Sequence, residues 1–113
     1  MYPVRIVLLH STSGAEIAQR GATALRTSLE LSASAADATV QHIRTRVLSG
    51  RIEAIAFVAA PSLSEAESLC DNASRALTQV GQPLAGWQVT TCLADFALTV
   101  GWLTTARHDI YEE

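Results

Sequence analysis

Two apolar runs in the chain predict buried β-strands. Residues 4–9 read VRIVLL and residues 52–60 read IEAIAFVAA, and both runs are rich in β-branched or aliphatic side chains. Continuous apolar runs of this length are typical of strands that are covered on both faces. Pro61 follows the second run and predicts its end.

Apolar positions with helical spacing follow each of these strands. Ser13-Gly-Ala-Glu16 matches a capping box, in which the serine is the N-cap and the glutamate reaches back. Ser64-Glu-Ala-Glu67 is a second such box, and Gly81 predicts the end of the helix that it opens. The first helix carries Ile17, Gly21, Leu25 and Leu29 on one stripe, and the second carries Leu69, Ala73, Ala76, Leu77 and Val80.

The segment between the first helix and the second strand allows two interpretations. Alternation of Leu29, Leu31 and Ala33 favours a short strand over residues 28–34. Alternatively, the first helix continues to about residue 32 and the chain then turns. Ser34–Asp37 can cap a further helix that ends at Gly50. The apolar face of that helix consists of Ala36, Val40, Ile43, Val47 and Leu48.

The last apolar segment, residues 87–104, changes its hydrophobic face part of the way along. Trp87, Val89, Thr91 and Leu93 occupy one face of an extended strand, whereas Phe96, Leu98, Val100 and Trp102 occupy the opposite one. We therefore expect a bulge, a kink or a hairpin break near Ala94-Asp95.

Strands that alternate with helices favour one α/β domain over residues 1–113. We expect a small open, mostly parallel sheet in the order βαβαβαβ plus a terminal strand, with helices packed on it. If residues 28–34 are not a strand, the alternative is an α+β ferredoxin-like split β-α-β sandwich with helices on one face.

The composition of the chain argues against several classes of function. The chain has a formal net charge of −3, and its eight basic residues are all arginines. No basic run is present, so we expect no nucleic-acid partner. The absence of lysine excludes Schiff-base catalysis and a phosphate loop ending in Gly-Lys-Ser/Thr. No apolar run approaches the length of a membrane span, so we expect a soluble, cytoplasmic protein that has no membrane partner.

The loop after the first strand is the candidate site for a small anionic ligand. It contains His10, Ser11, Thr12, Ser13 and Gly14, and leads directly into a helix N-terminus, where free backbone N–H groups attract anions. Residues 11–14 resemble the phosphate loop of flavodoxins, but Glu16 stands where that loop has a hydroxyl. The alternative to a ligand site is an ordinary strand-to-helix turn.

No catalytic constellation, metal-ligand spacing or cofactor motif is recognisable, and whether the protein is an enzyme stays open. The two cysteines, Cys70 and Cys92, are too few for a disulfide framework. An apolar edge strand needs cover, so we expect a homo-oligomer whose interface contains Phe96, Leu98, Val100 and Trp102. The same side chains could instead complete the monomer core. The two functional hypotheses are a non-catalytic interaction or assembly module and a small enzyme or ligand-binding domain that uses the loop His10–Gly14.

Overall fold

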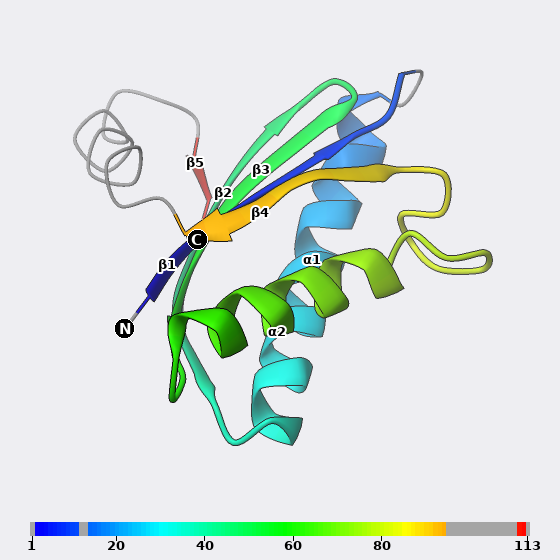
Figure 1. Ribbon diagram of the computed structural model, residues 1–113. Helices are drawn as coiled ribbons and strands as arrows, with labels where there is room; N and C mark the ends of the chain where they lie inside the picture. The colour runs from blue at the N-terminus through cyan, green and yellow to red at the C-terminus, as the bar shows by residue number, and fades with distance from the viewer. Residues whose placement is uncertain (1, 12–13, 95–110, 113) are drawn as a thin grey trace.

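A five-stranded sheet with two helices makes up the part of the chain that the structure describes, residues 2–11, 14–94 and 111–112 of a computed structural model (Figure 1). The elements in chain order are β1 (Tyr2–Leu9), α1 (Ala15–Ala35), β2 (Thr39–Leu48), β3 (Arg51–Ala59), α2 (Leu63–Ala76), β4 (Gln88–Ala94) and β5 (Tyr111–Glu112). The two strongest apolar runs of the sequence are confirmed as strands, β1 and β3.

The sheet is antiparallel throughout its described strands, with the order β4-β1-β3-β2-β5. Both helices pack on the same face, α1 against β2 and β3 and α2 against β1 and β4 (Figure 1). The protein therefore has an α+β fold, and the expected mostly parallel α/β sheet is wrong. Helices on one face are a feature of the α+β alternative, but the structure has β2 where a second consecutive helix was expected.

The strand–helix–strand pattern led to the wrong prediction of a parallel sheet because of the order of the strands. β1 and β2 are joined by α1 and run in the same direction, because both are antiparallel to β3. However, β3 lies between them in the sheet. A crossover helix predicts that the two strands it joins are parallel, but it does not predict that they are neighbours.

Residues 39–48 form β2 and not a helix, which corrects the expectation of a helix ending at Gly50. Ile43, Thr45 and Val47 lie opposite helix-facing residues of β3, and the residues between them are polar. The apolar and polar positions of residues 39–48 therefore also alternate with a period of two, as in a β-strand. Gly50 ends β2 as part of a tight turn, because its φ of 70° permits the hairpin that pairs Leu48 with Arg51.

Helix α1 runs without interruption through residues 28–34, so the short strand considered there is absent. Asp37 ends the helical segment with a φ of 55°, and the N–H of Ala38 donates to the carbonyl of Ala33 at 2.9 Å. At the other end, the N-cap is Gly14 and not Ser13. Glu16 forms an exposed ion pair with Arg20 at 2.8 Å and does not reach back to the cap.

Helix α2 begins two residues earlier than expected. Ser62 is its N-cap, and the Ser62 hydroxyl accepts from the N–H of Glu65 at 3.2 Å. The capping box is therefore Ser62–Glu65 and not Ser64–Glu67. The helix ends at Ala76, so Val80 lies beyond it and is 99% exposed.

The hydrophobic core lies between the sheet and the two helices. Its central side chains come from β1, β3 and the inner face of α1. The Ser28 hydroxyl also joins the helices by donating to the Ala73 carbonyl at 3.2 Å. The fully buried large side chains of this core include Ile6, Leu8, Leu25, Leu29, Ile52 and Leu84.

Candidate functional site

A hollow at one end of the sheet contains two of the residues predicted to bind an anion. His10 and Ser11 line it together with Leu9, Gly50, Gly86 and Gln88, and its volume is about 560 Å³. The hollow combines the end of β1, the β2–β3 turn and the start of β4. Three segments far apart in the sequence therefore meet beside His10.

His10 is positioned by backbone and ring contacts. Its N–H donates to the carbonyl of Gly50 at 2.9 Å, which continues the β1–β3 pairing by one step. Its imidazole ring lies 5.6 Å from the ring of Trp87, tilted by 41°. Gly86 has a φ of 88°, and a Cβ at this position would lie 3.5 Å from His10 Nε2. A glycine at 86 therefore lets the chain turn closely around the histidine.

The other predicted anion ligands are not part of this hollow as the structure describes it. Gly14 is the N-cap of α1 and does not line the hollow. Thr12 and Ser13 lie outside the described residues. Sequence reasoning missed Gln88, because nothing in the sequence indicates that the start of β4 meets the end of β1.

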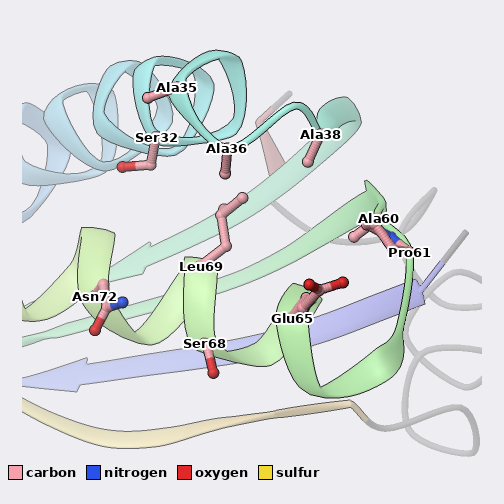
Figure 2. A pocket seen from close by; sticks show the side chains of 10 residues that line it. All are labelled: Ser32, Ala35, Ala36, Ala38, Ala60, Pro61, Glu65, Ser68, Leu69 and Asn72. Atoms are coloured by element: carbon pink, nitrogen blue, oxygen red, sulfur yellow. The ribbon is translucent and has the colours of Figure 1, made fainter.

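A second cleft lies between the C-terminal end of α1 and the first half of α2 (Figure 2). Its volume is about 420 Å³. Leu69 projects from α2 toward Ala36, and the one ionisable group among the described lining residues is the Glu65 carboxyl group. That carboxylate accepts from the Ser62 hydroxyl at 3.3 Å. The cleft thus has no acid–base pair; it is lined by Ser32, Ala35, Ala36, Ala38, Ala60, Pro61, Glu65, Ser68, Leu69 and Asn72.

The face of the sheet turned away from both helices is here called the outer face. Its residues follow from the register of β1 to β4, and they combine apolar, aromatic and basic side chains. They are Pro3, Arg5, Val7, Leu9, Thr39, His42, Arg44, Arg46, Leu48, Arg51, Glu53, Ile55, Phe57, Ala59, Gln88, Thr91 and Leu93. Half of the eight arginines of the chain lie on this face.

The centre of the outer face is buried. Val7 is 2% exposed and Ile55 is 0% exposed, although the described helices lie on the opposite face. Beside them, the Glu53 carboxylate forms an ion pair with Arg51 and lies 3.9 Å from Arg46 Nη1. The two guanidinium groups therefore give this nearly buried carboxylate charged partners at the edge of an apolar centre.

Strand β4 is an edge strand in the described sheet, with β1 as its neighbour. An extra residue, Thr90, shifts the register between Val7 and Leu8. Val89 therefore faces the helices, whereas Thr91 and Leu93 lie on the outer face, which corrects the expectation that all three share one face. Leu93 is 60% exposed.

The far end of β4 is held by α2. The Glu67 carboxylate accepts from the N–H of Ala94 at 2.8 Å, so a side chain replaces the strand partner that an edge position lacks. This contact fixes the point where the chain leaves β4. The predicted interface residues Phe96, Leu98, Val100 and Trp102 follow directly and lie outside the described residues.

Neither cysteine is suited to act as a nucleophile. Burial, together with the negative charge of Glu67, raises the pKa of Cys70 to about 12. Burial also raises the pKa of Cys92 well above the usual value for a thiol. Because the thiolate is the reactive species, both groups are unreactive near neutral pH.

The described residues contain neither a candidate metal site nor a helix that could span a membrane. Within residues 2–11, 14–94 and 111–112, no three His, Cys, Asp or Glu side chains are grouped so that they could hold a metal ion. Neither helix is long and apolar enough to cross a membrane.

Comparison with known proteins does not assign the chain to a family. No family model matches it, and no curated protein does. One solved structure, described as an unknown protein from Galdieria sulphuraria, is 13% identical and superposes with a TM-score of 0.44. The match covers 85% of this chain and 47% of the other, so the chain spans about half the length of that protein. A likeness at this level indicates no function.

Proposed function

We propose that the protein is a non-catalytic assembly module, which forms a homo-oligomer through the outer face at β4 and the segment that follows it. The observation that carries this proposal is Leu93, which is 60% exposed on an edge strand of the described sheet. An edge strand with an exposed large apolar side chain invites pairing or packing with another chain.

The composition of the outer face supports the same function. Leu9 and Leu48 are 36% and 40% exposed at one end of this face, and Phe57 is half-buried at the other end, opposite Pro3. Interfaces between like chains combine an apolar centre with a polar or charged rim that favours arginine. Arg51 lies opposite both Leu9 and Leu48, and Arg5 lies opposite Leu93, so arginines border the exposed leucines of this face.

The first prediction concerns Leu93→Glu, which should weaken self-association by at least about tenfold, because a charge would be buried in the contact. Arg5 lies directly opposite Leu93 in the register, so the new carboxylate is compatible with the folded monomer. The mass of the native protein, measured by light scattering over a concentration series, tests this. Trp102→Glu is expected to act in the same direction.

Val80→Glu is the matched control, because Val80 is 99% exposed and lies outside the sheet. It introduces the same charge and should leave the mass unchanged. A wild-type chain that stays at 12.0 kDa at the highest concentration contradicts the proposal. So does a Leu93→Glu variant that associates as strongly as the wild type.

Binding of a small anion in the hollow beside His10 is the second candidate function. The observation that favours it is the meeting of His10, Ser11 and Gln88 in one hollow, since imidazole, hydroxyl and amide groups can all donate to an anion. The N-terminus of α1 follows directly in the chain, and its partial positive charge also favours an anion.

The second prediction is that saturating inorganic phosphate raises the melting temperature of the wild type by about 4 °C or more. His10→Ala should abolish the shift, because it removes a donor from the hollow. His42→Ala is the matched control, since His42 lies on the outer face beside Phe57, with ring centroids 5.9 Å apart. A wild type that phosphate does not stabilise, or a His10→Ala variant that it stabilises equally, contradicts this candidate.

A further inference from the structure

Strand β2 has a second strand beside only part of its length. β3 pairs with β2 from Thr39 to Leu48, whereas β5 lies opposite only Thr45 and Arg46. No second strand lies beside residues 39–43 in the part of the chain that the structure describes. Gln41 is the extra residue of a bulge in this part of β2, and bulges are common at sheet edges, where they re-aim a side chain. Addition of an extended peptide to a sheet edge is a common mode of recognition.

Two adjoining hollows lie between this edge of β2 and helix α1. The first has a volume of about 280 Å³, and its lining includes Arg26, Glu30 and the start of β2. The second has a volume of about 250 Å³, shares Glu30 and Val40 with the first, and extends to Thr39. The short turn after α1 brings the end of the helix directly to the start of β2 (Figure 1). Together, the two hollows are here called the β2 groove.

Helix α1 brings one charge of each sign to the β2 groove. Arg26 and Glu30 are four residues apart and lie on the same side of the helix. Neither forms an ion pair with a described residue, whereas Glu16 and Arg20, at the same spacing on this helix, do. The reason lies in their order, since an acidic residue that precedes the basic one is the more favourable arrangement. Arg26 and Glu30 are therefore available to the charges of a ligand.

The spacing of these two charges matches an extended peptide. Four helical residues rise about 6 Å, and two strand residues rise about 6.8 Å and point to the same face. Arg26 lies beside residues 40–43, and Glu30 also reaches Thr39. A segment antiparallel to β2, like the other described pairings of the sheet, therefore passes Arg26 before Glu30. Its complementary sequence is an acidic residue, any residue, and then a basic residue.

We propose that the β2 groove binds an extended segment of a partner protein that contains this acidic–x–basic sequence. The acidic side chain faces Arg26 and the basic one faces Glu30, with their aliphatic stems over Val40. No Asp or Glu of this chain is followed two residues later by an arginine, so the occupant is a different protein and not a second copy. The inference does not depend on the proposed self-association, because β4 lies on the other side of the sheet.

Fluorescence polarisation with two synthetic peptides tests this proposal on the full-length chain. The probe is fluorescein-Thr-Val-Glu-Val-Lys-Val-Thr-amide, and the matched peptide has its Glu and Lys exchanged. We expect the wild type to bind the probe at least about tenfold more tightly, because the exchange turns two attractive contacts into two repulsive ones. The preference should weaken as the salt concentration is raised.

Charge-exchange variants locate the binding site. Arg26→Glu/Glu30→Arg should reverse the preference, so that the exchanged peptide binds more tightly than the probe. Glu16→Arg/Arg20→Glu is the matched control, since it exchanges an exposed pair of the same spacing outside the groove. This control should keep the preference of the wild type. Circular dichroism checks that both variants are folded.

Each outcome of the titrations decides for or against the β2 groove. Reversal in Arg26→Glu/Glu30→Arg, but not in the control, supports the proposal. A wild type that binds neither peptide, or binds both equally, overturns it, as does an Arg26→Glu/Glu30→Arg variant that keeps the wild-type preference. If the probe dissociates a wild-type oligomer in light scattering, a second copy occupies the groove, which also overturns the assignment to a different protein.

Discussion

Leu29→Ala is expected to lower the free energy of unfolding by about 2–5 kcal/mol, because it removes a fully buried side chain and leaves a cavity. Leu29 is 0% exposed in the core, whereas Leu31 is 68% exposed on the same helix. Leu31→Ala is therefore expected to change the free energy by less than about 0.5 kcal/mol. Urea denaturation of the two variants and the wild type measures both values.

This pair of variants also tests how residues 28–34 fold. In a strand, positions 29 and 31 share a face, and the two substitutions would have similar costs. In α1 they lie roughly 200° apart around the helix axis, so the costs differ strongly. Equal losses for Leu29→Ala and Leu31→Ala would contradict the continuous helix over Ala15–Ala35.

Gly21→Val is expected to destabilise the protein by about 1–3 kcal/mol through overpacking. A Cβ at position 21 would overlap Leu84 Cδ2 and would lie 3.0 Å from Ile52 Cδ1. Valine has a higher helix propensity than glycine, so a loss of stability reports the steric conflict and not the helix. Thermal and urea unfolding measure the loss.

Thr23→Val is the matched control, because Thr23 is an exposed position of the same helix and the substitution adds the same side chain. An unchanged stability for Gly21→Val would mean that Leu84 does not pack against α1. A further effect is expected at the hollow, since the N–H of Trp87 donates to the Leu84 carbonyl at 3.0 Å. Displacing Leu84 should therefore shift Trp87, and tryptophan fluorescence should report this.

The central strands and the positions of the helices could be predicted because their signals are local. The runs at 4–9 and 52–60 are apolar with strand-forming residues, and β1 and β3 cover them almost completely. Of the predicted stripe, Gly21, Leu25 and Leu29 are buried against the sheet, as a helix of period 3.6 requires. Ile17, in the first turn of α1, is 46% exposed and does not belong to this buried stripe. Each of these signals depends on residues that are close together in the sequence.

Helix ends and β2 were predicted less well because local signals compete there. Two overlapping Ser-x-x-Glu patterns, beginning at Ser62 and Ser64, precede α2, and the structure uses the first. Glu67 then holds the end of β4. In residues 39–48, Ile43 and Val47 fit a helical face and a strand face equally well. The hairpin with β3 selects the strand, since it satisfies the backbone hydrogen bonds of both.

The candidate sites, like the fold, could be predicted only where their residues are close together in the sequence. His10 and Ser11 were recognisable because they follow a predicted strand, but Gly50 and Gln88 join them through contacts distant in sequence. The outer face could not be recognised at all. Its arginines are spread over three strands, and the sequence shows no basic run. Only the register of the sheet brings them together.

The amino-acid sequence by itself determined where the chain is apolar, where it turns and which segments form the central strands and the two helices. Only the tertiary structure decided the order and direction of the strands. The physical reason is that an α-helical crossover constrains the direction of the strands it joins, whereas their neighbours depend on long-range pairing. The insertion of β3 between β1 and β2 gave each of these two strands an antiparallel neighbour in place of a parallel one.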